Sequence, residues 1–292
     1  MRLKGAFTAL VTPFKNGRID EEAYRALIEW QITEGINGVV PCGTTGESAT
    51  LSHKEHEAVI RICVEQVNGR VPVVAGGGSN NTTEAISLTR FAKDAGADAV
   101  LHITPYYNKP TQEGLYQHFK AIAENVDIPL VLYNVPGRTG VNMLPATVAR
   151  LVRDVPTVCA LKEATANLTQ VSETIELCKG KLTLLSGDDF TILPTMAVGG
   201  VGVISVLSNI LPKDTACLCR AMEEGDYEEA RRLHFKMMPL TRLLFCETNP
   251  TPVKAALALM GKIGPEMRLP LVPMSEPNEK KLRQELERLN LI

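Results

Sequence analysis

The sequence has neither the charge imbalance nor the long apolar segments that characterise nucleic-acid-binding and membrane proteins. Its 31 lysine and arginine residues are balanced by 33 aspartate and glutamate residues, so no overall positive charge exists to attract phosphates or an anionic membrane surface. The longest nearly apolar stretch, residues 196–207, contains three glycines and is too short to cross a bilayer as a regular helix. We therefore expect a protein that binds neither nucleic acid nor a membrane.

The sequence also lacks paired cysteines and an export signal. None of its seven cysteines belongs to a Cys-x-x-Cys pair, and their odd number and apolar surroundings predict reduced thiols in a cytoplasmic protein. The short apolar stretch at the N-terminus is interrupted by Pro13, and no signal-peptide cleavage site follows. With 292 residues, 45% of them hydrophobic, the chain is long enough for one large α/β barrel or two ordinary domains.

Short apolar runs alternate with amphipathic segments along most of the chain, which is typical of a parallel sheet built from βαβ units. Eight such runs predict strands at residues 6–11, 38–42, 71–76, 99–104, 129–135, 158–163, 182–187 and 202–207. Segments between them predict helices, among them residues 21–34, 54–67, 83–95 and 112–125. Eight units fit a closed (β/α)8 TIM barrel. The alternative, an open doubly wound sheet, favours a glycine-rich dinucleotide fingerprint after the first strand, and the sequence has none there.

The strand pattern stops after residue 225. Three helices are predicted beyond it, at residues 227–245, 253–260 and 279–289. No low-complexity linker separates the two parts. We therefore expect a barrel domain at residues 1–225 with a C-terminal helical region at residues 226–292 packed against it.

Lys162 is the most informative residue, because the active sites of such barrels lie at the C-terminal ends of the strands. It ends the otherwise apolar run Val158–Leu161. Desolvation there lowers the pKa of an amine, and a neutral amine can form a Schiff base with a ketone, as in class I aldolases. The structural alternatives are a lysine that reaches solvent at the rim or pairs with Glu163.

Three further groups follow other strands. Tyr133 is a candidate proton donor, or else a packed core tyrosine. Thr44 and Thr45, between Gly43 and Gly46, suit a carboxylate, although the same loop can be a simple strand-to-helix turn. Arg138 can bind a second carboxylate with its guanidinium fork, or remain solvated.

Metal and phosphate chemistry find less support. His53 and His56 lie three residues apart, without the His-Glu-x-x-His pattern of zinc enzymes. Asp188 and Asp189 can bind a hard cation, but loop acids are more often hydrogen-bonded to the backbone. The segment 76–81, GGGSNN, matches neither phosphate-loop pattern. We expect no metal and no cofactor.

Five segments together resemble the dihydrodipicolinate synthase family. They are GTTGESATL (43–51), TPYYNKPTQEG (104–114), YNVPGRT (133–139), LKEAT (161–165) and SGDD (186–189). They follow the family's order and spacing, and NPTPVKAAL (249–257) resembles its C-terminal helical region. The departures from the family pattern are Pro41, Cys42, Ala166, Val206 and Leu207, with alanine at 166 where the family suggests glycine.

The resemblance implies a lyase of the class I aldolase type, in which Lys162 forms an imine with pyruvate. The derived enamine would attack the aldehyde of L-aspartate 4-semialdehyde, and the product would cyclise to 4-hydroxy-tetrahydrodipicolinate, the first committed step of diaminopimelate and lysine biosynthesis. The implied proton relay consists of Tyr133, Thr44 and the Tyr107 of a neighbouring subunit in a homotetramer. The implied substrate-binding residues are Thr45, Gly187 and Ile204 for pyruvate and Arg138 for the semialdehyde.

The resemblance also implies feedback inhibition by L-lysine. The residues that match the family's effector site are Ser48, Ala49, His53, His56, Asn80, Glu84 and Tyr106. Without the resemblance, His53, His56 and Glu84 would simply be exposed residues near helix N-termini. Two other functions stay open: a related aldolase that acts on N-acetylneuraminate or a 2-keto-3-deoxy sugar acid, and a non-catalytic barrel that binds an amino or keto acid. Arg138 within YNVPGR favours the synthase.

Overall fold

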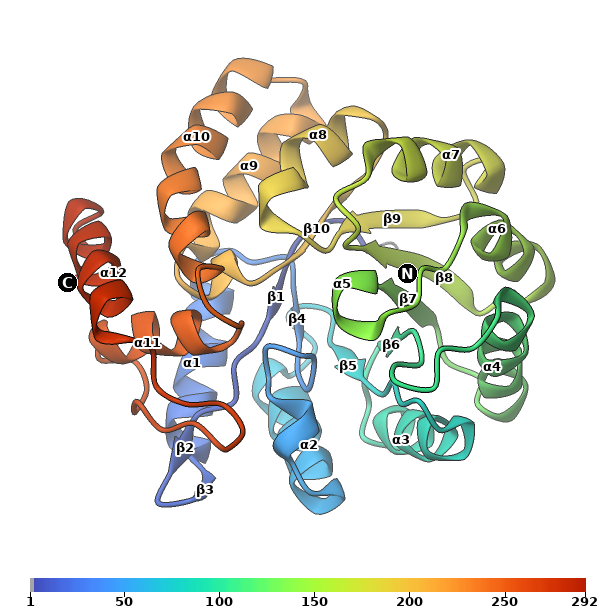
Figure 1. Cartoon of the computed structure of the whole chain (residues 1–292), viewed down its shortest axis with the longest axis horizontal. Helices are drawn as coiled ribbons and strands as arrows, with labels where there is room; N and C mark the ends of the chain where they lie inside the picture. Colours follow the sequence, from blue (N-terminus) through green and yellow to red (C-terminus); the bar gives the residue numbers. More distant parts are fainter. Residues whose placement is uncertain (1–2) are drawn as a thin grey trace.

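The computed structural model describes residues 3–292, and it confirms the predicted (β/α)8 barrel with helices after it (Figure 1). The eight barrel strands pair in parallel in the order β4-β1-β10-β9-β8-β7-β6-β5. A parallel bridge between Val39 and Val73 joins the two ends of this order and closes the barrel. The strands are β1 (Gly5–Ala9), β4 (Gly38–Val40), β5 (Val74–Gly76), β6 (Ala99–Ile103), β7 (Leu130–Asn134), β8 (Val158–Glu163), β9 (Thr183–Ser186) and β10 (Gly202–Ser205).

Side chains alternate between two hydrophobic cores along each strand, as the pleat of a strand requires. In β7, Val131 and Tyr133 belong to the core inside the barrel, whereas Leu130 and Leu132 belong to the core between strands and helices. The inner core fills the barrel, so a site built on these strands is expected at an end of the barrel.

Helices surround the strands, and polar caps begin several of them (Figure 1). Ser52 and Glu55 form a capping box at the start of α2, where each bonds the other's backbone N–H. The helices and turns that follow barrel strands are α1 (Glu21–Thr33), η1 (Ser48–Thr50), α2 (His53–Val67), α3 (Thr82–Asp94), α4 (Gln112–Asn125), α5 (Pro136–Thr139), α6 (Pro145–Asp154), α7 (Leu168–Cys178), η2 (Asp189–Thr191), α8 (Ile192–Ala197), η3 (Leu207–Asn209) and α9 (Pro212–Glu224).

Three more helices form the C-terminal part: α10 (Tyr227–Leu244), α11 (Thr251–Leu259) and α12 (Glu276–Arg288). Figure 1 shows α11 and α12 at the side of the molecule where α1 lies. Among residues 3–292, no helix combines the length and the apolar character that crossing a membrane requires.

One element is absent from the sequence prediction, the hairpin of β2 (Phe14–Lys15) and β3 (Arg18–Ile19). Asn16 and Gly17 connect its strands, and both have positive φ. An Asn-Gly pair with these dihedrals is the preferred two-residue hairpin turn. The turn signal was therefore present, but two-residue strands are too short to show an alternating pattern.

Candidate active site

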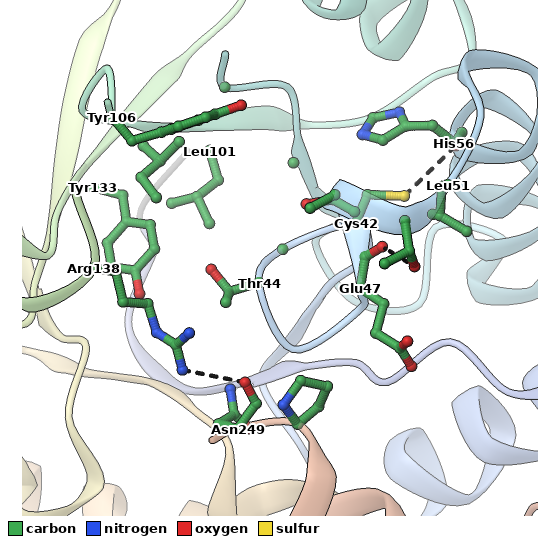
Figure 2. A pocket seen from close by; sticks show the side chains of 18 of the residues that line it. Cys42, Thr44, Glu47, Leu51, His56, Leu101, Tyr106, Tyr133, Arg138 and Asn249 are labelled. Carbon is green, nitrogen blue, oxygen red and sulfur yellow. Dashed lines mark hydrogen bonds between the residues drawn. The ribbon is translucent and has the colours of Figure 1, made fainter. Parts of the chain in front are cut away.

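A cavity of about 530 Å³ lies where the sequence predicts the active site, among the loops at the C-terminal ends of the strands. Thr44, Tyr133 and Arg138 all line it, from the ends of β4 and β7. Figure 2 shows these three side chains facing the same space, with Asn249 from the C-terminal part at its edge. The loops after β4 and β7 therefore converge here, whereas four other predicted site residues are not among those that line the cavity: Thr45, Lys162, Gly187 and Ile204.

Lys162 lies opposite Tyr133 in the register of β7 and β8. Its side chain is 6% exposed, and Nζ lies 4.2 Å from the centroid of the Tyr133 ring. Burial lowers the pKa of Lys162 to about 8; the carboxylate of Asp189 opposes this shift and the charge of Arg138 adds to it. Lys162 forms no ion pair with any residue in 3–292, so it neither reaches the rim nor pairs with Glu163. A substantial fraction of the amine is neutral at mildly alkaline pH.

Gly187 follows β9 and leaves space for the Lys162 side chain. A Cβ atom at residue 187 would come within 3.0 Å of the Lys162 Cγ and 2.8 Å of the Ala164 Cβ. Any larger residue would therefore displace the lysine. Ile204 in β10 is buried in the same inner core as Tyr133.

Tyr133 is buried, and its phenol is protonated at neutral pH. Burial raises the pKa of Tyr133 to about 12, while the charge of Arg138 and the side chain of Thr44 act to lower it. A protonated phenol beside a partly neutral amine is the arrangement needed to give a proton to a group attached at Lys162.

Asn249 forms hydrogen bonds with both Thr45 and Arg138, the two candidates for binding carboxylates. Nothing in the sequence indicated this role. Its side-chain Nδ2 donates to the Thr45 hydroxyl at 3.0 Å, and its backbone carbonyl accepts from the Arg138 guanidinium at 3.2 Å. Thr45 and Asn249 are buried, whereas Arg138 is exposed toward the cavity. The motif NPTP resembles the family, but its contact with a threonine 204 residues away has no local signal.

Asp189 lies near Lys162, although the sequence suggested it only as a candidate cation ligand. One of its carboxylate oxygens accepts the backbone N–H groups of Val206 and Leu207, both at 2.9 Å. Its other oxygen is buried and has no hydrogen-bond partner among residues 3–292. Burial raises the pKa of Asp189 to about 6. The carboxylate therefore holds the backbone that follows β10 and favours the protonated form of Lys162. Within residues 3–292, no cluster of three or more His, Cys, Asp or Glu side chains is arranged to hold a metal.

Six of the seven residues predicted to bind an effector line the same cavity. Those that line it are Ser48, Ala49, His53, His56, Glu84 and Tyr106. Asn80 does not line it but holds the segment, because its Nδ2 donates to the Tyr106 carbonyl at 3.1 Å. His53 Nε2 lies 3.0 Å from Glu84 Oε1. Burial and the neighbouring His53 lower the pKa of His56 to about 4, so His56 is neutral at physiological pH.

Tyr107 is a predicted catalytic residue whose side chain does not line the cavity of its own chain. Its side chain is 90% exposed, and its φ of 69° lies in the left-handed region. Tyr106, one residue earlier, faces the cavity instead, as Figure 2 shows. The side chains of the two adjacent tyrosines therefore lie on different surfaces.

Two of the sequence departures have a structural reading. Ala166 has a φ of 56°, which explains why the family pattern suggests glycine at this position. Cys42 also has a positive φ, and its thiol donates to the His56 carbonyl at 3.5 Å. Cys42 thus lies between the loop that carries Thr44 and the helix that carries His56 (Figure 2).

Comparison with known proteins gives the same family as the sequence motifs. The chain matches the Dihydrodipicolinate synthetase family over residues 2–289. It is 66% identical over 283 residues to the 4-hydroxy-tetrahydrodipicolinate synthase of Nitratidesulfovibrio vulgaris, covering 97% of each chain. It is 65% identical over 292 residues to the enzyme of the same name from Oleidesulfovibrio alaskensis, covering 100% of both.

Solved structures of such enzymes have the same fold. A crystal structure of a dihydrodipicolinate synthase with 53% identity superposes with a TM-score of 0.98 and covers 99% of this chain and 100% of the other. The chloride-inhibited enzyme from Acinetobacter baumannii in complex with pyruvate gives 0.97 at 46% identity, covering both chains fully (100%). The enzyme from Cyanidioschyzon merolae with lysine bound gives 0.95 at 40% identity, covering 99% of each.

These matches span nearly the whole chain, and the residues at the mouth of the barrel carry the motifs on which the resemblance rests. The chain belongs to the dihydrodipicolinate synthetase family.

Proposed function

We propose that this protein is a 4-hydroxy-tetrahydrodipicolinate synthase, which condenses pyruvate with L-aspartate 4-semialdehyde in the biosynthesis of diaminopimelate and lysine. The observation that carries the proposal is the buried Lys162 amine beside the ring of Tyr133, which lines the cavity together with Arg138. The chemistry requires no metal or separate cofactor, because the lysine imine itself withdraws electrons from the substrate.

The neutral Lys162 amine attacks the pyruvate ketone, and loss of one water gives an imine. Removal of a methyl proton then gives an enamine, whose carbon attacks the semialdehyde carbonyl and forms the new carbon–carbon bond. We assign the proton transfers to Tyr133 with Thr44, and to a partner subunit's Tyr107. Attack by the product's own amine on the imine carbon closes the ring and releases the lysine. Each of these steps adds or removes a proton, and a relay of phenol and hydroxyl groups can transfer such protons.

The binding roles follow from charge and geometry. Thr45, Gly187 and Ile204 would hold pyruvate next to Lys162, and the Arg138 fork suits the carboxylate of the semialdehyde. Asn249 supports both Thr45 and Arg138 through its hydrogen bonds.

Borohydride trapping tests the covalent step. With pyruvate and borohydride, the wild-type chain should gain the mass of a reduced pyruvate adduct on Lys162, and Lys162→Ala should gain none while remaining folded. Lys213→Ala, at an exposed position of α9, is the matched control and should trap like the wild type. Pyruvate-dependent trapping that persists in Lys162→Ala would refute the assignment.

A paired substrate assay distinguishes this function from the two alternatives. A synthase should consume L-aspartate 4-semialdehyde with pyruvate and ignore N-acetylmannosamine, whereas a sialate-type aldolase should do the reverse. A binding module should trap no pyruvate at all. Arg138→Ala should impair turnover of the semialdehyde far more than trapping of pyruvate, and equal loss of both would make Arg138 a structural residue.

We also propose that L-lysine is an inhibitory effector and that the protein is a cytoplasmic homotetramer. The effector proposal is supported by two groups in the cavity wall, the Glu84 carboxylate for the ligand's ammonium group and the Tyr106 hydroxyl as a donor to its carboxylate. The tetramer is supported by the exposed Tyr107, and the location by cysteines that are all free thiols within the described residues.

The division into a barrel domain (1–225) and a helical region (226–292) is a further proposal. It is supported by Gly225, which has a φ of 79° and ends α9 just before α10 begins.

A further inference from the structure

A second residue pair lies directly behind Tyr133 and Lys162, on the outer face of the same two strands. Asn134 and Glu163 are opposite each other in the register, one residue beyond the catalytic pair. Because side chains alternate along a strand, these two point away from the barrel interior. Both are buried, and Asn134 Nδ2 donates to Glu163 Oε2 at 3.1 Å.

The Glu163 carboxylate is held entirely by neutral donors. Oε1 accepts the Thr165 backbone N–H at 2.8 Å, and Oε2 accepts from Gln170 Nε2 at 3.3 Å as well as from Asn134. Glu163 forms no ion pair with any residue in 3–292. A buried carboxylate without a cation is costly unless hydrogen bonds replace water, so this acceptor joins β7, β8 and the start of α7 at one point.

The donors around Glu163 have their orientations fixed by a second layer. Asn134 Oδ1 accepts the backbone N–H of Met143 at 3.0 Å, so its amide nitrogen must point toward Glu163. Asn142 Oδ1 accepts from Asn134 at 2.8 Å and from Gln170 at 3.1 Å, and Asn142 Nδ2 donates back to Gln170 at 2.8 Å. Every donor in this cluster therefore requires an acceptor-only group at position 163.

The register of β7 and β8 is not uniform along the two strands. The pairing of β7 with β8 shifts between Leu130 and Val131, so the two strands change alignment before they reach the catalytic pair. A shift of one residue in such a pair exchanges the inner and outer faces. It would replace Lys162 by Glu163 or Leu161 at the mouth of the barrel.

We infer that Glu163 is a positioning residue, whose bonds with Asn134 and α7 on the outer face hold the ends of β7 and β8 in the register that keeps the Lys162 amine beside the Tyr133 ring. The inference rests on the proposed role of Lys162 in forming the pyruvate imine. It assigns to the buried acid of LKEAT a task that requires no contact with substrate.

The test is the pH dependence of borohydride trapping in Glu163→Gln. The new amide would keep one acceptor oxygen and place an NH2 donor either against the Thr165 N–H or against the amides of Asn134 and Gln170, so the cluster should open on one side. Lys162 would then leave its desolvated position, and its apparent pKa should move from about 8 toward the ordinary lysine value. The groups that face Lys162 and must stay unchanged are Tyr133 of β7, Arg138 of α5 and Asp189 of η2.

We expect Glu163→Gln to move the midpoint of the trapping profile up by at least one pH unit and to lower kcat at least tenfold, with a smaller change in KM. The double variant Asn134→Asp/Glu163→Gln exchanges donor and acceptor between the strands at constant net charge. It should return the midpoint most of the way. Glu173→Gln, an exposed change of the same type on α7, is the control and should behave like the wild type.

Each outcome decides the question. An unchanged midpoint and trapping rate in folded Glu163→Gln would overturn the inference, as would a shifted midpoint that the double variant fails to restore. If Glu163→Gln does not fold, Asn134→Ser, which removes the cross-strand donor together with the bonds to Met143 and Asn142, should show the same upward shift, and its absence would equally overturn the inference. Failure of the wild type to trap pyruvate would instead refute the proposed function.

Discussion

At the scale of single residues, the proposed mechanism makes activity depend on the protonation of Lys162. The amine must be neutral to attack pyruvate, and burial lowers its pKa to about 8. The trapping rate should therefore rise with pH through about 8 and then level off. Asp189→Asn removes the carboxylate that favours the protonated amine, so the pKa of Lys162 should fall and the midpoint should move to lower pH.

Stopped-flow or quenched trapping over a pH series measures this midpoint. Asp94→Asn, at the exposed end of α3, is a suitable control because it removes the same charge far from the barrel mouth. A midpoint that stays in place or rises in Asp189→Asn would show that Asp189 does not act on Lys162 through its charge.

Ala166 gives a residue-scale prediction about stability. Its side chain is exposed and its φ of 56° disfavours any residue with a Cβ atom. Ala166→Gly should therefore raise the free energy of unfolding by about 0.5–1 kcal/mol, the conformational penalty being larger than the entropy that glycine adds to the unfolded chain. Urea denaturation measures the change. A less stable variant would mean that contacts of the alanine methyl group stabilise the fold by more than the conformational penalty at residue 166.

The site residues differ in how readily the sequence predicts them, for physical reasons. Lys162 is conspicuous because a charged residue at the end of an apolar strand has a limited set of explanations. Asn249 and the orientation of Asp189 depend on how a loop folds back onto residues far away in the chain. Spacing carries information about neighbours on one strand or helix, and it carries none about such contacts.

At the scale of elements, a buried ion pair fastens helix α11 to the loop after β4. Lys254 Nζ pairs with Glu47 Oε1, both side chains are fully buried, and the Lys254 ammonium also lies 4.4 Å from the centre of the Phe14 ring. Burial lowers the pKa of Lys254, and the carboxylate opposes that shift. Breaking such a pair leaves one charge buried without compensation.

Lys254→Met should therefore lower the free energy of unfolding by about 3–5 kcal/mol, because Glu47 would remain buried without its partner. Glu47→Gln/Lys254→Met removes both charges and should recover a large part of that loss. Chemical denaturation of the two variants provides the measurement. Equal destabilisation of both would indicate that the packing around the lysine stem, and not the unpaired charge, dominates.

The elements themselves were largely predictable from the sequence. All eight barrel strands overlap the predicted runs, because strands buried on both faces appear as continuous apolar segments. The small hairpin of β2 and β3 was missed, since its stability comes from neighbours such as Glu266, which accepts the Gly17 N–H at 2.7 Å. A pattern within two strands of two residues cannot reveal a partner that far along the chain.

At the scale of the whole molecule, Thr44, Tyr133 and Arg138 line the same cavity as most of the effector candidates. We expect L-lysine to inhibit partially and without competing with pyruvate, since the effector residues lie outside the space next to Lys162. His56→Lys should weaken this inhibition, because a positive charge in place of a neutral imidazole repels the ligand's amine. Initial rates at several concentrations of pyruvate and L-lysine measure both effects.

The matched control is His234→Lys, which adds the same charge on α10 away from the cavity and should leave inhibition unchanged. Full wild-type activity at saturating L-lysine would contradict the effector proposal, and the catalytic assignments would stand.

The side chains that complete the site come from late in the chain. Asn249 and Lys254 follow their partners Thr45 and Glu47 by 204 and 207 residues. A ribosome that has translated as far as α10 has already made Lys162, Tyr133 and Arg138, but the nascent chain still lacks both contacts that hold the loop after β4. We therefore expect an unfinished polypeptide that ends before Asn249 to lack the supported loop that the proposed reaction with pyruvate needs.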